Sequence, residues 1–231
     1  DDGTGDSGFN RGGPLFSSPT VLGTGAAAAL GLALSEQVVL RSATMPQARE
    51  LMAAVYHPVT RRIYLFGGRR ADGLATSDVL EFDPQTGGLT GASDVLPTAR
   101  AGVSAAYDPA TNKIYVFGGF DNSGFDLAQI VVYDPIAHSV ISAAGKLPTA
   151  RSLTSAAYDP ATARIYVFGG RQLGGAHLSQ IVSFNPATEA AAAVSTTLAS
   201  GRTETAAVYD PVSGDVILFG GNATGTWLTD V

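Results

Sequence analysis

Residues 113–119 read KIYVFGG, a short apolar run that ends at two glycines. In an extended strand, Ile114 and Val116 point to one face of the sheet, and Tyr115 and Phe117 point to the other. Since both pairs are apolar, we predict a strand over residues 113–117 that is buried on both faces. The paired glycines allow positive φ angles or a close backbone approach where the chain leaves the sheet.

Two sequence markers recur with one period. The triplet Phe-Gly-Gly begins at residues 66, 117, 168 and 219, so each copy lies 51 residues after the previous one. A second marker, Leu-Pro-Thr-Ala-Arg and its variants, ends at arginines with the same spacing of 51 residues. This shared period indicates internal repeats, which we number from the arginines as residues 49–99, 100–150, 151–201 and 202–231. Structural roles are predicted for Gly67, Gly68, Gly118, Gly119, Gly169, Gly170, Gly220, Gly221, Arg49, Arg100, Arg151 and Arg202.

Each repeat is predicted to hold four strands, named a to d. In the second repeat they cover residues 102–107, 113–117, 129–133 and 138–142. Tight turns containing proline join a to b and c to d, because proline presets φ at the first central position of such a turn. The aspartates of these turns are predicted to accept hydrogen bonds from nearby backbone N–H groups; they are Asp83, Asp108, Asp134, Asp159 and Asp210.

Residues 38–231 resemble the kelch-repeat proteins. The resemblance rests on a repeat of about 50 residues, the Gly-Gly doublet after an aromatic residue in strand b, and the Leu-Pro-x-x-Arg entry to strand a. It implies an all-β fold, a kelch-type β-propeller with about four to five four-stranded blades in this chain. The family commonly has a tryptophan in strand d, whereas the only tryptophan here, Trp227, precedes strand c of the fourth repeat.

We expect two parts, an N-terminal segment of residues 1–36 and a repeat region of residues 37–231. The N-terminal segment combines a flexible end with an uncharged stretch, residues 12–35, that forms either a divergent strand or a hydrophobic segment able to associate with a membrane. Three repeats are complete, and the fourth stops where strand c should begin. The chain is therefore part of a larger ring, or else a complete ring of four or five blades.

Composition excludes several functions. The formal net charge of −6 disfavours nucleic acid as a partner, and the absence of cysteine excludes thiolate metal sites and cysteine nucleophiles. The three histidines, His57, His138 and His177, have no metal-binding spacing and are interpreted as surface residues of turns and loops. Glu50 and Glu204, next to repeat arginines, could line a central channel but are interpreted as structural. We expect no cofactor, no metal and no catalysis.

The b–c loops differ between repeats, in contrast to the repeated turns at the opposite edge. They cover residues 69–77, 120–128, 171–179 and 222–228, and variable loops on a rigid frame commonly carry binding function. We predict a binding surface there; its residues are Arg69, Arg70, Asp72, Asp121, Phe125, Asp126, Arg171, His177 and Trp227.

The predicted function is a non-catalytic scaffold that binds a protein partner through its b–c loop face. Two alternatives stay open, because a fold does not determine a function. One is a propeller that binds or isomerises a carbohydrate, and the other is a structural subunit of a surface or membrane-associated assembly. The compartment is open as well, with an extracytoplasmic or cell-surface location preferred.

Overall fold

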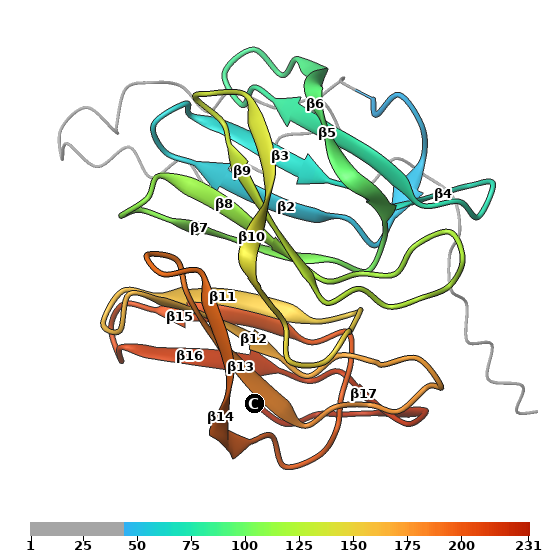
Figure 1. The fold of residues 1–231 in the computed structure, drawn as a ribbon, viewed down its shortest axis with the longest axis vertical. Coiled ribbons are helices and arrows are strands. Elements are labelled where there is room, and N and C mark those ends of the chain that lie inside the picture. Colours follow the sequence, from blue (N-terminus) through green and yellow to red (C-terminus); the bar gives the residue numbers. More distant parts are fainter. Residues whose placement is uncertain (1–43) are drawn as a thin grey trace, which may run out of the picture. The chain divides into compact units, whose positions relative to one another are not determined.

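The computed structural model describes residues 44–231, which fall in the second of the chain's two units, Asp1–Leu40 and Arg41–Val231. Our predictions for residues 1–36 therefore lie outside the described part of the chain. Every regular element in residues 44–231 is a β-strand, as the repeat pattern predicts. Figure 1 shows the antiparallel sheets following one another along the chain, from the blue and cyan strands to the red ones.

Each of the first three repeats forms one four-stranded antiparallel sheet in which neighbours in sequence are neighbours in space. The first sheet contains β2 (Ala53–His57), β3 (Arg62–Phe66), β5 (Thr76–Phe82) and β6 (Leu89–Arg100). The second contains β7 (Ser104–Asp108), β8 (Lys113–Phe117), β9 (Gln129–Asp134) and β10 (Ser139–Lys146). The third contains β11 (Ser155–Asp159), β12 (Arg164–Phe168), β13 (Gln180–Asn185) and β14 (Ala190–Thr197). These repeated meanders are consistent with a β-propeller.

The fourth repeat contributes a two-stranded sheet of β15 (Ala206–Asp210) and β16 (Asp215–Phe219). Two further pairs of two-residue strands involve b–c loops: the first joins the residues before β2 to the first b–c loop, and the second is a hairpin within the fourth. β1 (Arg49–Glu50) pairs with β4 (Arg69–Arg70), and β17 (Asn222–Ala223) pairs with β18 (Thr226–Trp227). These short pairs were not predicted, because two-residue strands leave no periodicity to detect.

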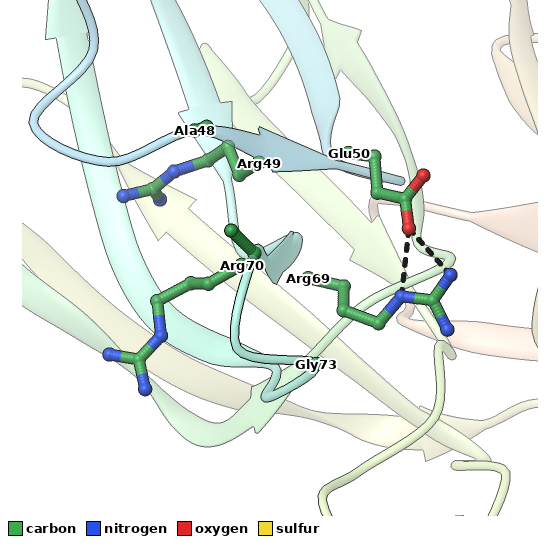
Figure 2. A pocket seen from close by; sticks show the side chains of 7 residues that line it. Ala48, Arg49, Glu50, Arg69, Arg70 and Gly73 are labelled. Atoms are coloured by element: carbon green, nitrogen blue, oxygen red, sulfur yellow. Dashed lines mark hydrogen bonds and ion pairs between the residues drawn. The ribbon is translucent and has the colours of Figure 1, made fainter.

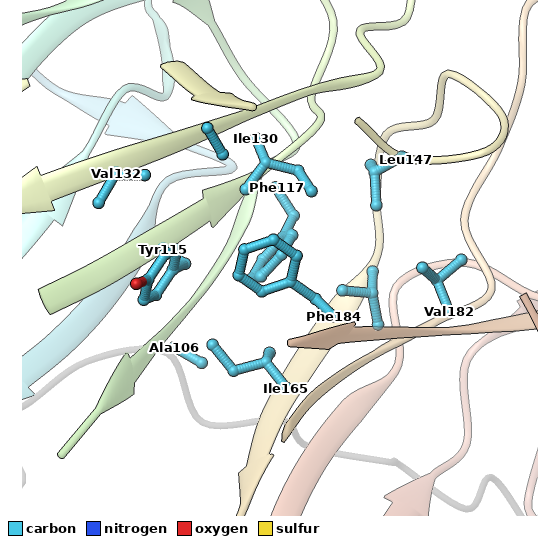
Figure 3. Close-up of a cluster of buried hydrophobic side chains, with 11 residues drawn as sticks. Ala106, Tyr115, Phe117, Ile130, Val132, Leu147, Ile165, Val182 and Phe184 are labelled. Atoms are coloured by element: carbon cyan, nitrogen blue, oxygen red, sulfur yellow. The ribbon is translucent and has the colours of Figure 1, made fainter. Parts of the chain in front are cut away.

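The core lies between successive sheets, and β8 shows why. Its side chains from Ile114 to Phe117 are each 1% exposed or less, which confirms the prediction that both faces are buried. Ile114 and Val116 pack with Tyr64 and Phe66 of the first sheet. Tyr115 and Phe117 pack on the other side with side chains of the third sheet, including Phe184 (Figure 3). The second sheet is therefore a layer between two neighbours.

His57 is buried, so the prediction that it is a surface turn residue was wrong. Its side chain is 0% exposed and lies edge-on to the rings of Tyr64 and Tyr107. Nδ1 lies 3.0 Å from the Thr60 hydroxyl, and Nε2 lies 3.3 Å from the carbonyl oxygen of Asn112 in the next repeat. The a–b turn packs against the neighbouring turn, which the sequence of one repeat does not reveal.

The aspartates of the turns act as predicted. Asp108 Oδ2 accepts hydrogen bonds from the backbone N–H of Thr111 (2.9 Å) and from its hydroxyl (2.6 Å). The equivalent carboxylates accept from the backbone or hydroxyl groups that follow them; these are Asp83, Asp134, Asp159 and Asp210. These residues stabilise the edge opposite the b–c loops.

The two repeat markers contact each other across every junction between described repeats. The N–H of Gly119 donates to the carbonyl of Arg151 at 3.0 Å, and the same contact joins Gly68 to Arg100 and Gly170 to Arg202. That carbonyl lies 2.2 Å from the position where a Cβ of Gly118 would be, which only glycine allows. Here a close approach requires the glycine.

The arginine side chain adds hydrogen bonds to its own repeat and to the end of the preceding one. The Arg151 guanidinium is fully buried and donates to the carbonyls of Thr149 (3.1 Å) and Gly169 (3.0 Å) and to the side chain of Gln180. Burial lowers the pKa of Arg100 and of Arg151 to about 10, so both remain charged at neutral pH. These geometries are the structural role predicted for the repeat arginines.

Candidate functional site

The four b–c loops share a closing hydrogen bond to the second glycine of their own repeat. The donors are the N–H groups of Thr76, Leu127, Leu178 and Leu228, at 2.7–2.9 Å from the glycine carbonyls. From Gly119 to Leu127 the loop takes 127−119, or eight, positions, whereas from Gly221 to Leu228 it takes 228−221, or seven. The fourth loop is thus one residue shorter, which places Trp227 at the position of Asp126 and His177.

Each b–c loop exposes a large apolar side chain. Phe125 is 55% exposed and Trp227 is 71% exposed, so both predicted aromatic residues face solvent. Leu74 and Leu173 are 46% and 63% exposed and were missed by the sequence analysis. Both leucines lie beside a glycine in a loop, a signal that could have identified them. We call these four side chains the loop tips.

Carboxylates hold the tips of the first two loops in place. Asp121 Oδ1 accepts hydrogen bonds from the N–H groups of Ser123 (2.8 Å) and Phe125 (3.0 Å). Asp72 accepts from the N–H of Leu74 (3.0 Å) and pairs with Arg70 at 2.8 Å. The backbone N–H of Leu74 is the main cause of a lowered pKa of Asp72. These predicted binding residues therefore act as internal supports.

Adjacent loops are also joined to each other. Asn122 Oδ1 accepts from the N–H of Ala75 at 2.6 Å, and its amide donates back to the Ala75 carbonyl at 3.2 Å. His177 Nδ1 accepts from the N–H of Thr224 at 3.0 Å in the fourth loop. His177 therefore links two loops, and a loop-to-loop bridge limits the freedom of the tips.

A second junction places Asp126 near Ser152 and Arg171. Asp126 Oδ1 and Ser152 Oγ are both buried, and neither makes a hydrogen bond of the usual geometry to another atom of residues 44–231. Arg171 lies over the ring of Phe120, with its guanidinium carbon 5.9 Å from the ring centroid. Burial raises the pKa of Asp126, although the nearby Ser152 hydroxyl and Arg171 lower it in part.

Asp126→Asn is expected to stabilise the protein at neutral pH. A carboxyl group whose pKa is raised by folding favours the folded state most at pH values below its unfolded pKa, about 3.9. That contribution is lost as the pH rises through the folded pKa. The variant should therefore raise Tm at pH 7 by about 2 °C or more, and the gain should vanish near pH 3.5. Asp121→Asn is the control and should give no gain; an equal gain in both variants would reject the burial argument.

A cavity of about 440 Å³ lies beside the first b–c loop (Figure 2). Its lining includes Arg49, Glu50, Arg69 and Arg70. Figure 2 shows the guanidinium groups of Arg49 and Arg70 on one side and the Glu50–Arg69 pair on the other, with Arg69 Nε donating to Glu50 at 2.8 Å. Among the described residues, none that lines the cavity is aromatic and able to stack against a sugar ring.

Charges in and around this cavity are balanced. Arg69 pairs with Glu50, Arg70 with Asp72, and the buried Arg49 with Asp78 at 3.0 Å, so each arginine of the lining has a carboxylate partner. Within residues 44–231 the buried Nε of Arg49 has no hydrogen-bond acceptor, in contrast to the Nε atoms of Arg100 and Arg151, which donate to backbone carbonyls.

Residues 44–231 contain no cluster of three or more His, Asp or Glu side chains that could hold a metal ion. In the same part of the chain, no helix is long and apolar enough to span a membrane.

Comparison with known proteins gives a partial likeness. No family model matches the chain. Segments of multiple epidermal growth factor-like domains protein 8 are 38% identical over 85 residues in Rattus norvegicus and 38% identical over 86 residues in Homo sapiens. The protein of Mus musculus is 40% identical over 81 residues. Each match covers 32–35% of this chain and 3% of the relative, so the chain matches only a small part of those proteins.

Proposed function

We propose that the chain is a kelch-type β-propeller, or a large part of one, and that it acts as a non-catalytic binding module. In this proposal a protein partner docks on the b–c loop face. The fold part is supported by the 51-residue repeat, by three successive four-stranded meanders and by the contact of Gly-Gly with the next arginine. The extent of the ring is not part of the proposal.

The observation that carries the binding function is the set of loop tips. Leu74, Phe125, Leu173 and Trp227 are exposed on loops that are closed by hydrogen bonds to their own repeats. Large apolar and aromatic side chains on a pre-organised frame are the usual anchors of protein interfaces, since little conformational freedom is lost when a partner covers them. We therefore expect the partner to present an apolar surface patch that is surrounded by polar residues.

Exposed apolar residues at the opposite edge supply a matched control. Val59, Ile136 and Val212 lie in the proline-containing turns and are 62%, 56% and 93% exposed. Surface apolar residues are common and most have no partner. A comparison of the two edges therefore tests whether the loop tips are special.

The test compares two multiple variants with the unchanged chain. In one, the four loop tips are replaced by serine; in the other, Val59, Ile136 and Val212 are replaced by serine. Both should unfold within about 1 kcal/mol of the unchanged chain, because exposed positions contribute little to stability. Proteins captured from an extract of the natural source by site-specific crosslinking are then compared. Loss of one captured protein in the loop variant alone supports the proposal, and equal capture by both variants contradicts it.

Trp227 provides a direct readout of partner binding. It is the only tryptophan of the chain and its side chain is 71% exposed. Its emission should be that of an indole in water and should shift to shorter wavelength when a partner covers the fourth loop. A captured protein that leaves the emission unchanged binds elsewhere on the molecule.

A further inference from the structure

The junction between the first and second repeats contains a histidine–aspartate pair. Asp94 lies in β6, the outer strand of the first sheet, and His138 lies in the turn between β9 and β10 of the second sheet. His138 Nδ1 is 3.6 Å from Asp94 Oδ2. The side chain of Asp94 is 13% exposed and that of His138 is 56% exposed, so the carboxylate is largely buried while the imidazole reaches solvent.

The hydroxyl of Tyr133 lies beside this carboxylate. Tyr133 is 0% exposed, and its hydroxyl and Asp94 Oδ2 are both buried without a hydrogen bond of the usual geometry to another atom of residues 44–231. Burial is the main cause of a raised pKa of Tyr133, to which Tyr64 and Asp94 add. The phenol therefore stays neutral at physiological pH and can act as a donor. Buried polar atoms without a partner are unfavourable, which indicates that this junction is incomplete as it stands.

The next junction replaces all three residues together. The positions 51 residues later hold Gly145, Phe184 and Glu189. The backbone of Glu189 leaves no room for a Cβ at Gly145, and its carboxylate accepts from the N–H of Ala144 at 2.6 Å, so that junction is closed by the chain itself. Residues that recur in every repeat maintain the frame. Three neighbouring residues that depart from the repeat at one junction indicate a role particular to that place.

The separation of the histidine nitrogen and the aspartate oxygen suits two ligands of one metal ion. At 3.6 Å these atoms are too far apart for a hydrogen bond. Two ligand atoms that each lie about 2.0–2.2 Å from a tetrahedral zinc ion are about 3.3–3.6 Å apart. Imidazole nitrogen and carboxylate oxygen are both common zinc ligands. The two residues are 138−94, or 44, positions apart in sequence, so no local motif could reveal them.

The charges around the pair favour a cation. Among the described residues, Asp94 forms no ion pair with a lysine or an arginine. Arg62, in the adjacent strand β3, is already paired with Glu81 and Asp83 at 3.0 and 3.3 Å. The Asp94 carboxylate is therefore uncompensated whenever the imidazole is neutral, which is the form that binds metals. A dication between the two side chains would satisfy the buried Asp94 Oδ2.

We propose that His138 Nδ1 and Asp94 Oδ2 bind one divalent ion of the zinc class at the junction of the first and second repeats. Tyr133 would hold the carboxylate by a hydrogen bond from the buried side, as residues behind metal ligands commonly do. Water would complete the coordination, because His138 is more than half exposed. The ion would join the outer strand of one sheet to a turn of the next. The proposal is independent of what the loop tips bind.

The test is a zinc titration of the full 231-residue chain without an affinity tag, followed by calorimetry. The unchanged chain is expected to bind zinc, and Asp94→Asn and His138→Gln should each weaken binding about tenfold or more. Tyr133→Phe copies Phe184 of the third sheet and should weaken it about tenfold, the usual effect of losing a residue that supports a ligand. His177→Gln is the matched control, since it removes a histidine elsewhere and should bind like the unchanged chain.

Thermal unfolding gives a second readout. Zinc should raise Tm of the unchanged chain, because only the folded chain brings Asp94 and His138 together, and this rise should disappear in both ligand variants. Calcium should give no rise, since it requires six to eight oxygen ligands. The Tm of each variant without metal shows whether it is folded. A chain that binds no zinc at millimolar concentration, or equal zinc affinity in the unchanged chain and both ligand variants, would overturn the proposal.

Discussion

Gly118→Ala is expected to lower the free energy of unfolding by about 4 kcal/mol or more, an unusually large effect for one methyl group. The added Cβ would lie 2.2 Å from the Arg151 carbonyl oxygen, which is backbone and cannot rotate away. The second and third repeats would have to separate, and the Gly119 N–H would lose its bond to that carbonyl. The positive φ of 58° adds strain for any residue with a Cβ.

The variant Gly124→Ala separates the steric clash with the Arg151 carbonyl from the strain of a positive φ. Gly124 has a similar positive φ of 80°, but a Cβ there would meet no atom within 4 Å. It should cost about 1–2 kcal/mol, the backbone contribution alone. Urea unfolding of both variants, followed by circular dichroism, measures the difference. Equal losses at Gly118 and Gly124 would show that the close approach of Arg151 contributes nothing.

Arg151→Ala is expected to cost about 3–5 kcal/mol, the second largest effect. The change leaves the carbonyls of Thr149 and Gly169 and the side chain of Gln180 without their buried donor, at about 1–3 kcal/mol for each buried group that finds no other partner. Burying the guanidinium is itself unfavourable, as its lowered pKa shows, and removing it recovers part of this loss. Three acceptors lose their buried donor, whereas only the desolvation of one guanidinium is recovered. We therefore expect the free energy of unfolding to fall.

Two comparisons make the Arg151 result specific. Arg151→Lys should recover less than half of the lost stability, because one ammonium group cannot reproduce the planar set of donors. Arg62→Ala should cost about 1 kcal/mol or less, since Arg62 is 36% exposed and pairs with Glu81 and Asp83 at the surface. Chemical denaturation of the three variants gives the loss in free energy of unfolding for each. Similar losses for Arg62→Ala and Arg151→Ala would exclude a special role for the buried arginine.

Periodicity predicted the strands well where both faces pack. The strand predicted over residues 113–117 is β8, Lys113–Phe117, since its apolar residues and the following glycines mark both ends. The bounds of strand d were harder to predict from the sequence. β6 runs from Leu89 to Arg100 with two register shifts against β5, well beyond the expected length. Outer strands carry small or polar residues with little alternation, so their ends depend on pairing that the sequence does not display.

For the candidate site, the exposure of two loop residues could be predicted from the sequence, whereas the contacts of others could not. Phe125 and Trp227 are exposed as expected of binding residues. Asp121 and His177 instead support loops. The partners of Asp121 are backbone N–H groups of its own loop, whereas the Thr224 N–H becomes a neighbour of His177 only after the repeats stack. Burial of His57 has the same origin, since the carbonyl of Asn112 lies 55 residues away in sequence. The sequence of one repeat, taken alone, cannot reveal contacts that depend on a neighbouring repeat.

The shared contact between the glycine doublet and the next arginine also bears on how the chain can change in length. Since each junction uses the same atoms, a unit of 51 residues could be deleted or duplicated while every remaining boundary keeps its bonds. Stability would then grow or shrink by roughly constant steps, as in other one-dimensional arrays. A deletion that removes part of a strand or one of the two markers would instead break these contacts at that junction. Changes of length are therefore best tolerated as whole repeats or within the b–c loops, the fourth of which is already one residue shorter.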